Sequence, residues 1–92
     1  MVFEFPTNAA AAAAGAAAYH DLVCTFGADP MAVRSHPEIA IGARVGTGSD
    51  AVAFWLAGNR VVELDYSLYG SRATALQDAA VTLRASWTHT HP

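Results

Sequence analysis

The apolar positions of this 92-residue chain recur at two spacings, which predict a helix near each end and strands between them. Residues 2–5 alternate between apolar and polar and predict a short strand, which Pro6 ends because it lacks a backbone donor. Residues 9–26 are rich in alanine and predict a helix, with an N-cap at Thr7–Asn8 and a stop at Gly27. The large side chains of this helix recur at helical spacing and form one packing stripe, made of Tyr19, Leu22, Val23 and Phe26.

The central part of the chain alternates between apolar and polar residues and predicts three strands. We expect them over residues 38–45, 51–57 and 61–68, with a glycine-rich turn over residues 46–50. Ahead of these strands, residues 29–34 predict one short helical turn, because aspartate followed by proline is frequent at a helix start.

The register of the second hairpin follows from the side chains that it brings face to face. A two-residue loop would set Phe54 opposite Glu63, so we expect a three-residue loop, Gly58-Asn59-Arg60, with a bulge. In this register Trp55 lies opposite Glu63 on the polar face of the sheet. A large aromatic side chain exposed on a sheet commonly anchors an interface. We therefore interpret Trp55 as an interface residue.

Residues 72–87 predict a second helix, capped by Gly70-Ser71. Its apolar stripe consists of Leu76, Ala79, Ala80, Leu83 and Trp87. These elements predict an α+β fold: a two-layer sandwich in the order β-α-β-β-β-α, with an antiparallel sheet of three to four strands and both helices on one face. We expect one domain over residues 1–87 and a flexible tail over residues 88–92.

Composition narrows the classes of function. The chain has a net charge of −3 and no lysine, so it lacks the basic surface of a nucleic-acid-binding protein. The alanine-rich helix is too weakly hydrophobic to cross a membrane, and a single cysteine is typical of a reducing compartment. We expect a cytoplasmic protein, and its arginine and alanine usage favours a bacterial source. Because alanine leaves few large side chains for a core, we expect a homo-oligomer, with a dimer favoured.

Two pairs of side chains suggest reactive or metal-binding chemistry. His20 and Cys24 lie one helical turn apart, and a histidine beside a thiol can lower its pKa; a buried thiol beside a surface histidine is the simpler interpretation. His89 and His91 could chelate a metal, but two ligands in a tail do not make a tetrahedral site. We therefore predict neither a metal nor a cofactor.

Charged residues gather on the predicted polar face of the sheet. Glu63 and Asp65 are carboxylates two positions apart on one strand, a pattern that could serve acid–base chemistry if both were desolvated. A solvated strand face explains them more simply, with Arg44 as a counter-charge on the neighbouring strand.

Two short motifs resemble the pterin-4a-carbinolamine dehydratase family. Phe3-Glu4-Phe5-Pro6 before a helix and His36-Pro37-Glu38-Ile39-Ala40-Ile41 entering a strand are similar to its F-x-F-P strand and its His-His-Pro-Glu/Asp turn. The resemblance implies a pterin site containing His36, with Trp55 and Asp65 matching its later positions. Ser35 stands where the family has its first histidine, which removes half of the acid–base pair and is typical of non-catalytic relatives that act as assembly factors.

The sequence thus leaves three functions open. The preferred one is a small non-catalytic protein–protein interaction or assembly module that self-associates and binds a protein partner, with an interface formed by Trp55, Glu63, Asp65 and Arg44. The alternative is a pterin dehydratase-like enzyme or pterin binder, in which His36 and Asp65 are the candidate catalytic residues. The third is a structural subunit of a larger particle.

Overall fold

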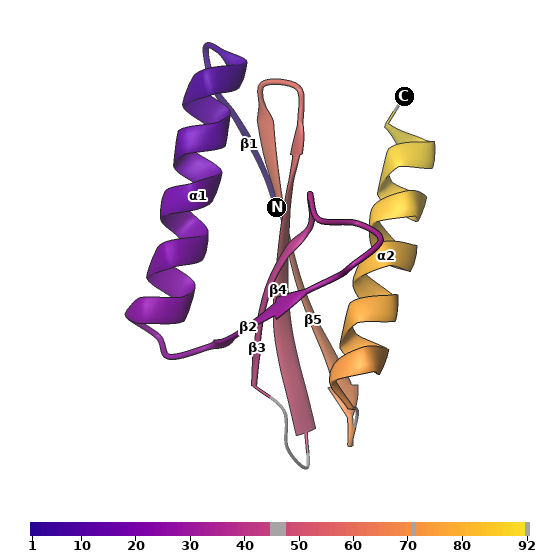
Figure 1. Cartoon of the computed structure of the whole chain (residues 1–92). Helices are drawn as coiled ribbons and strands as arrows, with labels where there is room; N and C mark the ends of the chain where they lie inside the picture. The colour runs from indigo at the N-terminus through magenta and orange to yellow at the C-terminus, as the bar shows by residue number, and fades with distance from the viewer. Residues whose placement is uncertain (45–47, 71, 92) are drawn as a thin grey trace.

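The computed structural model, which describes residues 1–44, 48–70 and 72–91, has three layers: helix α1, one antiparallel sheet, and helix α2 (Figure 1). The described strands form a five-stranded sheet in the order β1-β5-β4-β3-β2. The elements are β1 (Val2–Glu4), α1 (Asn8–Cys24), β2 (Asp29–Ala32), β3 (Ala40–Arg44), β4 (Gly48–Ala57), β5 (Arg60–Tyr69) and α2 (Ala73–Thr90). The α+β class is confirmed, but the prediction of three to four strands is wrong by one strand.

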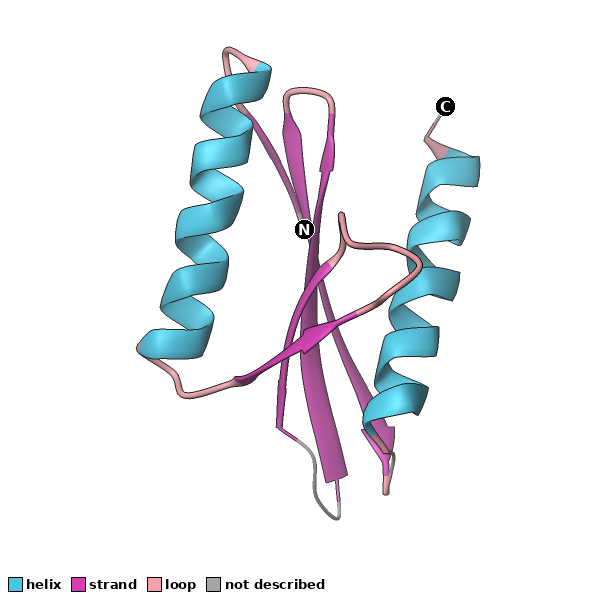
Figure 2. Ribbon diagram, viewed as in Figure 1, coloured by secondary structure: helices cyan, strands magenta, loops and turns pink. Residues whose placement is uncertain are grey.

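The two helices lie on opposite faces of the sheet, and the prediction that both cover one face is wrong (Figure 2). Phe54 and Val61 pack under α1 together with Ala11. The side chains of the alternate positions pack toward α2, including Ala53, Trp55, Val62 and Leu64. Both faces of β4 and β5 therefore bury apolar residues, which a model with a single apolar face does not allow for.

The β4–β5 hairpin has a two-residue loop, so the expected three-residue loop is wrong. Ala57 pairs with Arg60, and Phe54 lies opposite Glu63. Gly58 adopts φ +64°, as the first loop residue of a type II′ turn requires. The mismatch of Phe54 and Glu63 is tolerated because Glu63 is only half-buried. In this register Trp55 faces α2 and pairs with Val62 instead of Glu63.

Residues 29–32 form an edge strand where we expected a helical turn. β2 pairs with β3, and Pro30 lies opposite Gly42. Proline is compatible with an edge strand when its missing N–H would have pointed away from the sheet. The alternation that predicts strands is weak over these four residues, and the Asp-Pro pair alone predicted a helical turn there.

Helix α2 is shifted relative to its prediction. Its N-cap is Arg72, which makes no side-chain capping bond, and the helix continues to Thr90. His91 then stacks on Trp87 with ring centroids 4.2 Å apart, and residues 88–90, which we expected in a tail, belong to helix α2. The predictions that involve Val45, Gly46, Thr47, Ser71 and Pro92 lie outside the described residues.

Candidate functional site

The four residues of the expected interface do not share one exposed surface. Trp55 is only 3% exposed and packs edge-on against Trp87 of α2, with ring centroids 6.1 Å apart. The premise that it lies on a solvent-facing sheet surface is therefore wrong. Asp65 and Arg44 are exposed on the opposite face, where an Arg44 guanidinium nitrogen donates to the carbonyl of Phe26 at 2.6 Å.

The residues of the expected pterin site are also separated. Asp65 pairs with Val52 on the α1 face of the sheet, whereas Trp55 packs on the α2 face. His36 lies in the loop between β2 and β3, and its Nδ1 is 3.3 Å from Glu38 Oε1. The structure therefore does not bring His36, Trp55 and Asp65 into one cleft.

Glu38 links the β2–β3 loop to helix α2. Arg84 of α2 donates to Glu38 Oε1, the same oxygen that His36 approaches. A backbone hydrogen bond at Glu38, the nearby Arg84 charge and the bonds from both side chains lower the pKa of this carboxyl. Because Glu38 contacts both His36 and Arg84, we interpret these three residues as a surface contact that holds the β2–β3 loop against helix α2.

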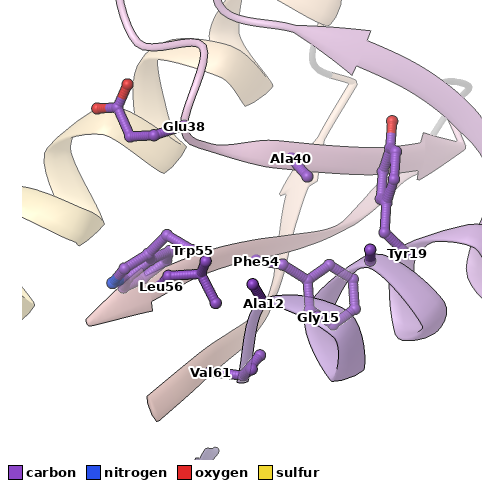
Figure 3. A pocket seen from close by; sticks show the side chains of 10 residues that line it. Ala12, Gly15, Tyr19, Glu38, Ala40, Phe54, Trp55, Leu56 and Val61 are labelled. Carbon is purple, nitrogen blue, oxygen red and sulfur yellow. The ribbon is translucent and has the colours of Figure 1, made fainter. Parts of the chain in front are cut away.

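An apolar hollow of about 270 Å³ lies between α1 and the end of β4 that extends past β3 (Figure 3). Gly15 and Tyr19 of α1 form one wall, Phe54 and Leu56 of β4 form another, and Glu38 lies at the rim. The Tyr19 hydroxyl donates to the carbonyl of Ile41 at 3.2 Å, and burial raises its pKa. Among the described lining residues, the ionisable groups are thus the Glu38 carboxylate and the Tyr19 hydroxyl, which is already hydrogen-bonded. They do not form an acid–base pair directed at a common point.

The remaining reactive side chains stay on the surface. Cys24 Sγ is 3.5 Å from His20 Nε2, and both residues are exposed. This contact is the one that a four-residue helical spacing predicts. Within the described part of the chain, no group of three or more histidine, cysteine, aspartate or glutamate residues is placed to hold a metal ion.

The outer edge of β5 is only partly paired within the described part of the chain. β1 pairs with β5 only as far as Val62, and Glu63 exchanges backbone hydrogen bonds with Met1 at 2.8 and 2.6 Å. Beyond this point no described strand covers residues 64–68 on that side. Backbone groups alternate along a strand, so the N–H and C=O of Asp65 and Ser67 point outward as those of Glu63 do.

The opposite edge of the sheet is protected. Pro30 has no N–H to offer a pairing strand, and the carbonyl of Ala32, two positions along, accepts from Gln77 Nε2 of α2 at 2.7 Å. Natural sheets use proline, short strands and covered edges to prevent pairing with other chains. β2 carries these devices and β1 is three residues long, whereas residues 64–68 of β5 contain no proline and are covered on their outer side by no strand of the described residues.

Comparison with protein-family models, with curated proteins and with solved structures finds no match to this chain. Neither α1 nor α2, the helices of the described residues, is both long and apolar enough for a membrane span.

The sequence interpretation missed the open edge, although one signal for it was present. The alternating pattern of the last strand extends over residues 61–68, whereas that of the first strand stops at Pro6 after residues 2–5. A four-residue strand covers at most half of an eight-residue one, so part of the edge of the last strand lies beyond residues 2–5.

Proposed function

We propose that the chain is a protein–protein interaction module, which acts by pairing the open edge of β5 with a strand of a partner molecule. The observation that carries this proposal is the contrast between residues 64–68 of β5, which no strand of the described residues covers on the side away from β4, and the protected edge at β2. Main-chain hydrogen bonds give such strand addition its affinity, and the alternating side chains give it specificity.

The side chains along this edge define the kind of strand that fits. Leu64 and Leu68 are half-buried on the α2 face. Asp65 and Ser67 are exposed on the other face, where the Ser67 hydroxyl donates to Asp50 Oδ1 at 2.6 Å. A complementary strand is therefore apolar on one face and polar on the other, and it carries no carboxylate directly opposite Asp65.

A single backbone substitution tests the proposal. Ser67→Pro removes the outward N–H of Ser67, at an edge position where proline is tolerated. Ser67→Ala is the matched control, because it removes only the hydroxyl that bonds to Asp50. A circular dichroism spectrum verifies that both variants fold.

The tagged chain is immobilised and exposed to a lysate that also contains an untagged copy of the chain. We expect the wild type and Ser67→Ala to retain a stoichiometric protein, either the untagged copy or another polypeptide, that Ser67→Pro loses. Equal retention by folded Ser67→Pro, or no retained protein at all, would contradict the proposed function.

A further inference from the structure

We propose that His20 and Cys24 of helix α1 form half of a zinc site, which the same two residues of a second copy complete. One zinc ion is then held between two chains by two thiolates and two imidazoles. The site lies on a different part of the molecule from the open edge of β5, so this inference does not rest on the proposed function.

The pair has the spacing of two ligands that share one zinc ion. Cys24 Sγ lies 3.5 Å from His20 Nε2. Zinc binds thiolate sulfur at about 2.3 Å and imidazole nitrogen at about 2.0–2.1 Å, in tetrahedral geometry. At a tetrahedral angle of about 109°, these bond lengths place the sulfur and the nitrogen about 3.6 Å apart. The two ligand atoms are therefore already positioned to bind the same ion.

The pair lies on the side of α1 that faces away from the sheet, and α1 is an outer layer of the molecule (Figure 1). Ala11 is fully buried against the sheet, and His20 follows it by nine residues, which is about two and a half helical turns. Cys24 lies one turn further along the same side, and both residues are exposed. Both side chains thus point away from the sheet that their own chain forms.

One chain supplies two of the four ligands that a tetrahedral zinc site needs. Over residues 1–44, 48–70 and 72–91, no third histidine, cysteine, aspartate or glutamate is placed to complete such a site. A second copy supplies an identical pair by two-fold symmetry, with the zinc ion on the axis. The resulting set of two cysteines and two histidines is one that closed structural zinc sites use.

The surroundings of the pair allow two α1 helices to approach each other. The exposed residues that precede the pair on the same side of the helix are all alanines: Ala9, Ala13, Ala16 and Ala17. Small side chains at a contact permit the shorter interaxial distances of packed helices, near about 8 Å. Asp21 carries a carboxylate beside the pair, and it accepts from Thr25 Oγ1 at 2.7 Å. The small side chains therefore leave the ligands as the groups that extend furthest toward a second helix.

Binding changes the protonation of the thiols and balances the charge of the site. Each Cys24 thiol gives its proton to water when the sulfur binds, and each His20 binds through Nε2 as a neutral imidazole. A Zn²⁺ ion and two thiolates together are neutral, so the site adds no net charge between the two copies. Because protons are released, zinc binding should tighten as the pH rises.

Titration of the full chain with zinc tests both the ligands and the second copy. Reduced protein without a histidine tag is titrated with zinc sulfate by isothermal calorimetry, and its mass is measured by light scattering with zinc and with EDTA. We expect one zinc ion per two chains, and a mass with zinc at least twice that in EDTA. Cobalt(II) in place of zinc should give the visible spectrum of a tetrahedral site with thiolate ligands.

A variant of unchanged composition separates the two ligands. Ala17→His combined with His20→Ala places the histidine seven residues, about 10.5 Å along the helix axis, from Cys24. We expect this variant to lose the zinc-dependent change in mass and to bind zinc about 100-fold more weakly or worse, because changes that only misorient a ligand already cost about 10–100-fold. Its circular dichroism spectrum verifies the fold.

His89→Ala combined with His91→Ala is the matched control, because it removes the two histidines near the end of α2 and should bind zinc as the wild type does. Loss of binding in this control, or equal binding by the separated variant, would overturn the assignment to His20 and Cys24. One zinc ion per chain with an unchanged mass would overturn the second copy, and a wild type that binds no zinc would overturn both.

The outcomes are independent of those for the proposed function. EDTA removes the zinc contact and leaves backbone pairing at β5 intact. Retention of a protein by the immobilised chain is therefore measured in EDTA, where a loss caused by Ser67→Pro reports on the edge of β5 alone. The zinc-dependent change in mass should persist in Ser67→Pro, and its absence from that folded variant would overturn the site on α1.

Discussion

Leu22 of α1 occupies the space that the missing side chain of Gly42 leaves on β3. A Cβ atom at Gly42 would lie 2.5 Å from Leu22 Cδ2 and 3.1 Å from its Cγ. The helix therefore approaches the sheet closely at this point because the strand carries a glycine. This contact fixes the position of the C-terminal half of α1, where the larger side chains of the helix are found.

Gly42→Ala is expected to destabilise the fold, because Leu22 must leave its position. Overpacking of this kind costs about 1–3 kcal/mol in the free energy of unfolding. Urea unfolding measures the change. Gly48→Ala is the control, since a Cβ there meets no atom of the described residues within 4 Å, and alanine should be neutral or slightly stabilising. If the two substitutions gave equal effects, the contact with Leu22 would not be the cause.

Trp55 is expected to tolerate phenylalanine far better than alanine. Its Nε1 is buried and has no hydrogen-bond partner among the described residues, and an unpaired buried donor costs about 1–3 kcal/mol. Trp55→Phe loses part of the ring but also removes this donor, so we expect a change within about 1 kcal/mol. Trp55→Ala opens a cavity and should cost about 3–5 kcal/mol. Thermal unfolding followed by circular dichroism distinguishes the two variants. A larger loss for phenylalanine than for alanine would contradict this account.

Tyr66 is expected to make the fold sensitive to alkali. Its hydroxyl donates to the carbonyl of Leu76 at 2.6 Å, and burial raises its pKa from 10.0 to about 12. Because the pKa is higher in the folded chain than in the unfolded one, the stabilisation is complete below pH 10 and is lost as the pH rises through about 12. Tyr66→Phe should lose about 1 kcal/mol at neutral pH. Its stability should also fall less steeply between pH 10 and 12. Equal slopes for the two proteins would exclude Tyr66 as the titrating group.

The protected edge at β2 makes a further prediction about assembly. Pro30→Val restores an N–H on the outer side of β2, and Gln77→Ala frees the carbonyl of Ala32. The double variant then has two open edges on one chain, which permits open-ended growth where a single edge permits only a dimer. Light scattering should show particles larger than a dimer, and adding Ser67→Pro should reduce them. An unchanged mass would mean that these two residues do not protect the edge.

The sequence predicted the helices and strands well where one periodicity dominates. It predicted poorly which face of the sheet a residue occupies, because that depends on how the layers pack. The three central strands and both helices are found within a few residues of their expected positions, because alternation and helical spacing survive in any packing arrangement. The side on which Trp55 lies could not be predicted in the same way. It depends on whether the hairpin loop has two or three residues. Pairing Phe54 with Leu64 is favoured only if the sheet has a single apolar face.

The candidate site was predicted only in part. Asp65 does lie beside the open edge, but it was selected as a charged side chain, and the groups that matter there are backbone groups. Pairing between β1 and β5 joins residues at opposite ends of the chain, and no local pattern specifies where it stops. Only the difference in strand length gave an indication.

The pairing of β1 with β5 also affects the order in which the sheet closes. Met1 and Glu63 are 62 positions apart, whereas a two-residue loop joins β4 to β5. Closing a long loop costs more chain entropy than closing a short one, so the hairpin forms early and β1 joins late. During that interval the exposed side of β5 extends beyond residues 64–68 to its first residues. At high concentration, pairing of this edge with the chain's own β1 therefore competes with pairing to a neighbouring chain. The rate at which β1 pairs with β5 sets how often chains misassemble.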